Sequence, residues 1–276
     1  MKIAVAVATA DAMPDAFVVW RGIEDSIGKA AAFGYDGIEL ALQTADQVDV
    51  ARVEALLAEH GLGCPCVSTG QVFAGLGLYF TAREPEKRAA VIRVFEELID
   101  LAARLGAMVN IGRARGFVEE SEPREEAERR FIEVARELAG YAEPKGVTLI
   151  LEPVNRYEIN FINSVAEGAE LMGKVGAPNL ALMPDLFHMN IEDRSLGGVL
   201  EEHAEHVAYV HVADSNRLAP GQGHTDFRAV LGSLKRMEYG GWLGVEILPE
   251  PDPDTAARQG IDYLRPLLAE KQGGPY

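Results

Sequence analysis

The feature that most constrains the fold of this chain is a repeated alternation of short apolar runs with longer amphipathic segments. The eight runs are Ile3–Ala8, Gly37–Leu40, Gly63–Thr69, Ala107–Ile111, Val147–Glu152, Leu180–Asp185, Val207–His211 and Trp242–Glu246. Runs that are almost entirely apolar are typical of parallel strands covered on both faces. Because helical segments separate them, the pattern predicts repeated βα units. Eight units in a chain of 276 residues predict an α/β protein with one domain, a (β/α)8 TIM barrel over residues 1–276.

The segment Glu86–Leu105 illustrates the helical half of the repeat. Apolar residues recur there at helical spacing, with charged residues on the other side: Val91, Val94, Phe95, Leu98, Ile99 and Ala102. Gly106 stands where a helix C-cap is expected, and four glycines occupy the same place before other strands: Gly34, Gly61, Gly146 and Gly176. The last residues, 271–276, are expected to form a frayed tail.

Four of the strand-like runs end in a residue that can ligate a metal: Glu152, Asp185, His211 and Glu246. The carboxyl ends of barrel strands converge on one rim, where active sites lie. An acid at the end of an apolar central strand is costly unless it is paired or ligated. The alternative is four unrelated strand ends, each satisfied by neighbouring backbone. The pattern favours one divalent ion, and the oxygen-rich donor set suits Mn²⁺, Co²⁺ or Mg²⁺, with Zn²⁺ left open.

Further polar residues follow the same strands and are expected to line a substrate pocket on this rim. Asn155 and Glu158 come after the fifth strand, His188 after the sixth and Arg217 after the seventh. For Glu158 alone, a solvated loop position is an equal alternative.

Two arginines, Arg113 and Arg115, follow the fourth strand. An arginine at the rim of an acidic protein could bind a substrate carboxylate or phosphate through two parallel hydrogen bonds. The alternative is that both arginines pair with acids of their own loop, such as Glu119 or Glu120.

Composition excludes several classes of function. A formal net charge of −17 repels phosphate backbones, so neither nucleic acid nor an anionic membrane is an expected partner. No apolar run approaches the roughly 20 residues that span a bilayer. The start of the chain resembles a short secretion signal, but a first barrel strand explains it better. The two cysteines, Cys64 and Cys66, are badly placed for a mutual disulfide, which favours a cytoplasmic location.

Several motifs resemble the xylose-isomerase-like superfamily of sugar isomerases and epimerases, and within it the D-tagatose 3-epimerase group of ketose and keto-sugar-acid 3-epimerases. The motifs are Glu152-Pro-Val-Asn-Arg-Tyr-Glu158, Asp185-Leu-Phe-His-Met-Asn190, His211-Val-Ala-Asp-Ser-Asn-Arg217 and Pro220-Gly-Gln-Gly-His-Thr-Asp-Phe227. Gly34–Glu39 and Ser68–Gln71 also resemble strand signatures of the superfamily, so the resemblance extends over nearly the whole chain.

The resemblance implies one divalent metal, Mn²⁺ before Co²⁺ or Mg²⁺, bound by Glu152, Asp185, His211 and Glu246. It implies that Glu152 and Glu246 are catalytic. One would remove the proton at C3 of a 2-ketose or keto-sugar acid, and the other would return a proton to the opposite face through a cis-enediolate. Residues Glu158, His188 and Arg217 match positions that hold the first oxygens of the substrate. A homodimer or homotetramer that binds a small sugar is expected.

Chemistry supports epimerisation independently. A proton next to a ketone is too weakly acidic for a carboxylate unless the developing enediolate is stabilised, and a metal that chelates two neighbouring oxygens supplies that stabilisation. Two bases on opposite faces allow inversion, whereas an isomerase that moves a proton along one face needs only one.

Four alternatives stay open at this stage. Within the superfamily they are an aldose–ketose isomerase, for example of the hydroxypyruvate type, and an inosose-type dehydratase. A metallonuclease of the endonuclease IV type would need more than the six histidines present and a basic groove. A sugar-binding barrel without catalysis would not need both glutamates.

Overall fold

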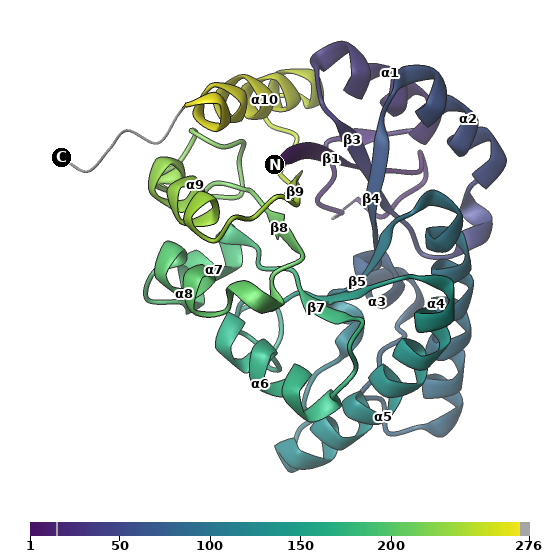
Figure 1. Cartoon of the computed structure of the whole chain (residues 1–276). Coiled ribbons are helices and arrows are strands. Elements are labelled where there is room, and N and C mark those ends of the chain that lie inside the picture. The colour runs from purple at the N-terminus through teal and green to yellow at the C-terminus, as the bar shows by residue number, and fades with distance from the viewer. Residues whose placement is uncertain (15, 271–276) are drawn as a thin grey trace.

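The structure, a computed structural model, describes residues 1–14 and 16–270, so the expected frayed tail at 271–276 lies outside the described residues. Eight parallel strands form a TIM barrel with helices on its outside (Figure 1). The barrel strands are β1 Lys2–Ala8, β3 Gly37–Ala41, β4 Gly63–Ser68, β5 Met108–Ile111, β6 Leu149–Leu151, β7 Leu180–Leu182, β8 Tyr209–His211 and β9 Trp242–Val245. Every apolar run therefore contains a barrel strand, as predicted.

The strands follow the order β7-β6-β5-β4-β3-β1-β9-β8 around the wall. Two isolated parallel bridges, Leu182 with Val207 and Asp185 with His211, join β7 to β8 and close the ring. The short strand β2, Trp20–Arg21, pairs with the end of β1 and was not predicted, because two residues carry no periodic signal. The predicted runs extend beyond some strands: Glu152 and Glu246 lie one residue past β6 and β9.

Ten α-helices lie within the described residues: α1 Ile23–Phe33, α2 Val50–His60, α3 Gly70–Leu76, α4 Pro85–Leu105, α5 Arg124–Ala142, α6 Val165–Val175, α7 Leu186–Glu192, α8 Leu196–Glu202, α9 Phe227–Arg236 and α10 Pro253–Ala269. The 3-10 turns are η1 Ala45–Gln47, η2 Arg113–Arg115, η3 Glu143–Lys145 and η4 Ala204–His206. The predicted helix at Glu86–Leu105 is α4, and Gly106 caps it with a φ of 66°. A side chain would be strained at that angle, which explains glycine there.

Side chains that point into the barrel form two layers. The first, which we name the apolar layer, consists of Cys66, Ile150, Met183 and Tyr209. The second, the polar layer, lies two residues further along the same four strands and consists of Ser68, Glu152, Asp185 and His211. Because side chains alternate between the two faces of a strand, both layers face the same interior.

A glycine makes room where β9 passes these layers. A Cβ atom added at Gly244 would lie 2.7 Å from the Tyr209 ring and 2.8 Å from the His211 ring. Glu246, two residues later, then reaches the level of the polar layer. The alternation of the strands and one missing side chain thus bring four ligand-type residues to the carboxyl end of the barrel.

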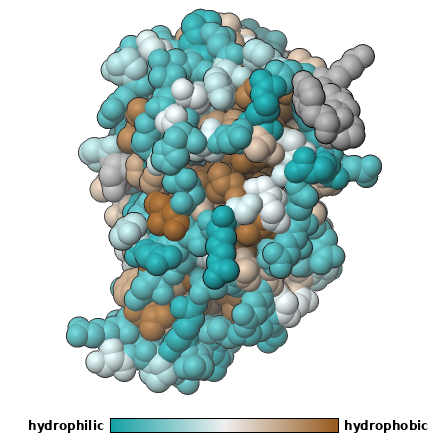
Figure 2. Space-filling model, turned by 90° about the vertical axis from the view of Figure 1, so that its left-hand side faces the viewer, coloured by the Kyte–Doolittle hydropathy of each residue, from teal (hydrophilic) through white to brown (hydrophobic). Residues whose placement is uncertain are grey.

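The outer surface is mainly hydrophilic. Figure 2 shows one face, where hydrophilic side chains predominate and hydrophobic ones form small patches. Among the described residues, the exposed large hydrophobic side chains are Leu76, Tyr157 and Tyr263. No described helix combines the length and the apolar character that a membrane span requires.

Candidate metal centre and substrate pocket

Glu152, Asp185, His211 and Glu246 meet at the carboxyl end of the barrel, as the sequence predicts. Each offers one ligand atom, and these four atoms lie within 4.8 Å of one another. Glu152, Asp185 and His211 are buried, and the side chain of Glu246 is 16% exposed. Three acids and one imidazole are thereby held in a space that a single ion could bridge.

His211 presents one ring nitrogen to this cluster. Its Nδ1 lies 3.4 Å from a Glu152 oxygen, 3.7 Å from a Glu246 oxygen and 4.0 Å from an Asp185 oxygen. On the other side of the ring, Nε2 lies 3.0 Å from both carboxyl oxygens of Glu39. A proton held on Nε2 by Glu39 leaves the Nδ1 lone pair for a metal.

Two atoms of the cluster are buried without a hydrogen-bond partner among the described residues: Oδ2 of Asp185 and Nδ1 of His211. The other oxygen of Asp185 accepts from the backbone N–H of Phe187 at 2.8 Å and caps α7. Buried polar atoms without partners are costly, and a metal ion would satisfy both.

The pKa shifts in the cluster indicate that its three carboxyl groups have too little positive charge around them to balance their own. Burial raises the pKa of Glu246, although His211 and Arg217 act against this shift. Burial also works to raise the pKa of Glu152, but the contact with His211 outweighs it and lowers the pKa. The pKa of His211 is raised because Glu39 and Glu246 outweigh the effect of burial. A divalent ion would replace the His211 proton and compensate the carboxylates, so the residues fit such an ion.

Glu39, fully buried, is a candidate functional residue that the sequence analysis mentioned only as the end of the motif Gly34–Glu39. Besides His211, it accepts hydrogen bonds from the Tyr209 hydroxyl at 2.8 Å and from the Ser68 hydroxyl. Its sequence signal differs from that of the ligands, because Glu39 lies inside the apolar run Gly37–Leu40 and in the middle of β3 and does not end the strand. The structure places it behind His211 instead of beside the other acids.

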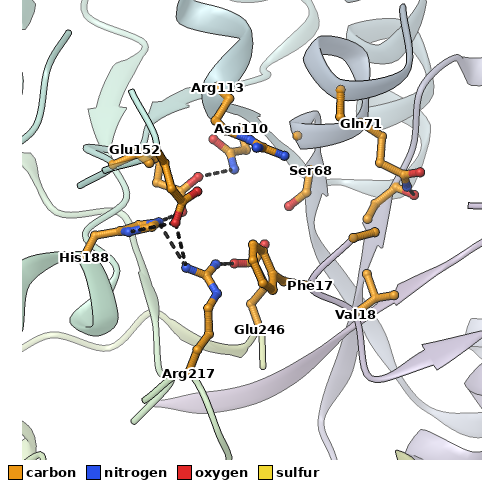
Figure 3. A pocket seen from close by; sticks show the side chains of 16 residues that line it. Phe17, Val18, Ser68, Gln71, Asn110, Arg113, Glu152, His188, Arg217 and Glu246 are labelled. Atoms are coloured by element: carbon orange, nitrogen blue, oxygen red, sulfur yellow. Dashed lines mark hydrogen bonds and ion pairs between the residues drawn. The ribbon is translucent and has the colours of Figure 1, made fainter. Parts of the chain in front are cut away.

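Arg217 lies between the metal cluster and the expected substrate residues. Its guanidinium pairs with Glu246, lies 3.5 Å from Asp185 Oδ2 and stacks on the ring of Phe17 at 3.9 Å (Figure 3). It also lies 3.9 Å from a Glu158 oxygen. Its backbone has a φ of 61°, which is unusual for a residue with a side chain.

Asn155 fixes the orientation of His188. The amide oxygen of Asn155 accepts from the backbone N–H of Tyr157 at 3.0 Å, so its amide nitrogen lies 2.8 Å from Nδ1 of His188 and donates to it. On the other side of the ring, Nε2 lies 3.2 Å from Nη1 of Arg217. Nε2 also lies 3.7 Å from Asp185 Oδ2 and 3.9 Å from Glu152 Oε1. Burial lowers the pKa of His188, which favours the neutral ring.

Arg115 does not line the pocket, which contradicts the expected substrate contact. Its fully buried guanidinium donates to four backbone carbonyls, those of Gly112, Glu152, Phe161 and Ile162, at 2.7–3.1 Å. The side chain therefore ties the loops after β5 and β6 together. The alternative pairing with Glu119 is also wrong, because Glu119 pairs with Arg83 at 3.2 Å.

Arg113, in contrast, lines the same pocket as Glu152 and Glu246. The pocket encloses about 590 Å³ of empty space, part of it open to solvent. Lining residues that the sequence analysis did not name include Phe17, Val18, Ala41 and Asn110. The amide nitrogen of Asn110 donates to Glu152 at 3.1 Å (Figure 3). Nothing in the local sequence pattern around these four residues distinguishes them from other loop or strand positions.

Comparison with known proteins agrees with this geometry. Residues 27–267 match the family described as xylose isomerase-like TIM barrel. The chain is 33% identical to an L-ribulose 3-epimerase of Methylomonas sp. (strain DH-1) over 231 residues, 82% of this chain and 78% of the relative. It is 31% identical to a ketose 3-epimerase of Arthrobacter globiformis over 249 residues, 87% of this chain and 83% of the relative.

A solved structure is also similar. The D-allulose 3-epimerase from Methylomonas sp., in complex with D-allulose, superposes with a TM-score of 0.79 at 26% identity, over 96% of this chain and 98% of the other. The match of the family over most of the chain and the identity to the L-ribulose 3-epimerase lead to one conclusion. This chain belongs to the xylose isomerase-like TIM barrel family.

Proposed function

We propose that this protein is a metal-dependent 3-epimerase of a free ketose or keto-sugar acid. The observation that carries the proposal is the meeting of two glutamates, Glu152 and Glu246, in a cluster that could hold a metal ion and in the lining of one pocket. Relatives named ketose 3-epimerase and L-ribulose 3-epimerase support the same reaction.

The two glutamates approach the site from different directions. Glu152 follows β6 and Glu246 follows β9, and two strands, β7 and β8, separate them around the wall. Such a separation suits an inversion, in which one carboxylate takes the proton from one face of C3 and the other carboxyl returns a proton to the opposite face. A bound divalent ion would polarise the ketone and stabilise the negative charge that develops on the substrate oxygens.

The remaining rim residues would hold and orient the sugar. We assign the first oxygens of the substrate to Glu158, His188 and Arg217, which lie together beside Glu246. Asn155 and Arg217 would hold the His188 ring in position, since they contact its two nitrogens. Arg217 would keep the Glu246 carboxyl oriented, since the two groups already form an ion pair.

The proposal includes finer points about the ion and the assembly. Mn²⁺ is the proposed ion, with Co²⁺ or Mg²⁺ as substitutes, because the donor set has three carboxylates and one imidazole. We also propose one domain, a homodimer or homotetramer, and a reducing cytoplasmic location, for which the free thiols of Cys64 and Cys66 are the support.

A panel of 2-ketoses and keto-sugar acids, incubated with the Mn²⁺-loaded protein in D₂O and followed by NMR, tests the proposal. We expect epimers with deuterium at the inverted carbon and the ketone unmoved. Aldehyde products would indicate an isomerase, and loss of water would indicate a dehydratase.

Removal of the metal is a second test. Chelation followed by dialysis should abolish turnover, and Mn²⁺ or Co²⁺ should restore it. Full turnover after this treatment would contradict a catalytic ion.

A further inference from the structure

We propose that Arg113 is an anion-binding residue and that the substrate is a keto-sugar acid, bound with its terminal carboxylate on the Arg113 guanidinium. The inference rests on the proposed function and narrows it from ketoses in general to those with a carboxylate at the far end of the chain. It rests on three points: the place of Arg113 in the pocket, its lack of a counter-ion among the described residues, and the length of a six-carbon chain between the reacting carbon and a terminal carboxylate.

The position of Arg113 is set by β5 and by Gly112. Arg113 begins the turn η2 directly after Gly112, and a Cβ atom added at Gly112 would lie 3.0 Å from Oε2 of Glu152. A side chain at position 112 would therefore crowd the Glu152 carboxylate, and glycine lets the chain turn close to it. The Arg113 side chain is half-buried and lines the pocket beside Asn110 and Ser68, across from Arg217 (Figure 3).

Arg113 has its N–H groups available for a ligand. Among residues 1–14 and 16–270 its guanidinium has no hydrogen bond or ion pair, and it lies over the ring of Phe73 at 5.9 Å. Contact with the face of an aromatic ring supports a guanidinium without using its in-plane donors. These donors can bind both oxygens of a carboxylate.

The other two arginines near the site already have polar or charged partners within the protein. Arg115 donates to four backbone carbonyls, and Arg217 is paired with Glu246 and lies close to Asp185. Of the three, Arg113 alone faces the pocket without a charged partner in the described part of the chain. A substrate anion would supply that partner.

The two ends of the pocket match the two ends of a six-carbon keto acid. If Glu158, His188 and Arg217 hold the first oxygens, the chain must run from there past the metal site toward the opposite wall, where Arg113 lies. A carboxylate at C6 is three carbon–carbon bonds from the inverted C3, so the charge does not disturb the ketone or the proton transfer.

The charges of the pocket favour a carboxylate over a phosphate. Glu152, Glu158 and Glu246 also line the pocket, and a phosphate dianion beside them would need more than one available cation. One guanidinium matches the single charge and planar shape of a carboxylate.

The test compares a 2-ketohexose with the 2-ketohexuronate and the 6-phosphate of the same configuration, at fixed Mn²⁺. We expect wild-type kcat/KM to be at least about tenfold higher for the uronate, mainly through KM, since charge pairing acts on binding. R113Q should lose most of this preference, and R113K should keep part of it. R93Q removes the same charge from an exposed arginine on α4 and should change neither value.

A binding measurement separates this inference from the proposed function. Calorimetry with gluconate and glucitol, which cannot be epimerised, should show tighter binding of gluconate to wild type and loss of the difference in R113Q. If no sugar is turned over but this difference is present, the proposed function fails and the anion site stands. Equal kcat/KM for the neutral and acidic sugars, an equal loss of both in R113Q, equal binding of gluconate and glucitol, or a preference for the phosphate overturns the inference.

Discussion

The apolar layer and the polar layer occupy the same interior, on the same strands, only two residues apart. Ile150, Met183 and Tyr209 fill the barrel, whereas Glu152, Asp185 and His211 are costly to bury and form the candidate metal centre. The comparison shows how a barrel separates its tasks along each strand. The apolar layer stabilises the fold, whereas the polar layer would carry out the chemistry at a cost in stability.

The largest expected effect comes from the polar layer. E152Q or E246Q should lower kcat by about 10³-fold or more, because each removes one of the two groups proposed to transfer protons. The melting temperature should not fall, since a neutral amide is easier to bury than a carboxylate. E54Q, at an exposed acid paired with Arg104, serves as the control for both measurements. Activity of either active-site variant within tenfold of wild type would rule out the two-base scheme.

Substitutions in the apolar layer should reduce stability and have little effect on kcat. I150A leaves a cavity beneath Glu152 and should lower the free energy of unfolding by about 2–5 kcal/mol, whereas I150V should lower it by about 0.5–1.5 kcal/mol. Urea unfolding measures both. If I150A reduced kcat per folded molecule as strongly as E152Q does, the two layers would not be functionally separate.

Glu39 connects the layers, and its removal tests whether it positions His211. E39Q should weaken Mn²⁺ binding by about 10–100-fold, because the amide no longer holds a proton firmly on Nε2 of His211. Calorimetry on the metal-free protein gives the affinity directly. Y209F removes another contact of Glu39 but keeps the His211 contact, so a loss of affinity as large as that of E39Q would argue for a packing effect.

The smallest effect concerns Asp193, a half-buried acid outside both layers. Burial raises the pKa of Asp193, which follows α7, to about 6. An acid with a raised folded pKa favours folding most at low pH, and this contribution is lost as pH rises through about 6. D193N should therefore gain stability relative to wild type between pH 4 and pH 7, by less than about 1 kcal/mol because the group is partly solvated. Unfolding curves that differ by the same amount at both pH values would refute this.

The sequence predicted what depends on local pattern. All eight barrel strands and helix α4 follow from periodicity, and the four ligand residues follow from a polar residue that ends an apolar run. In each case the signal and the structural cause lie on the same segment, since a strand end fixes both the position and the direction of the next side chain.

Contacts between distant segments could not be predicted in this way. Arg113 and Arg115 are the same residue type two positions apart, and only carbonyls from the loop after β6 decide that Arg115 is structural. Glu39 lies inside an apolar run, and its place behind His211 depends on the neighbouring strands. The pocket wall formed by Phe17 and Val18 arises from the connection between β1 and β2, a segment without periodicity.

The closure of the barrel between β7 and β8 has a consequence for where the protein would begin to unfold after metal loss. This seam is bridged at only two places, and one bridge joins Asp185 to His211, both expected ligands. An ion bound by Asp185 and His211 would connect the two sides of this seam from inside the barrel. Metal loss would then loosen the fold first along this line, and faster amide exchange at Ala208 and His211, whose N–H groups cross it, would report a depleted enzyme before it unfolds.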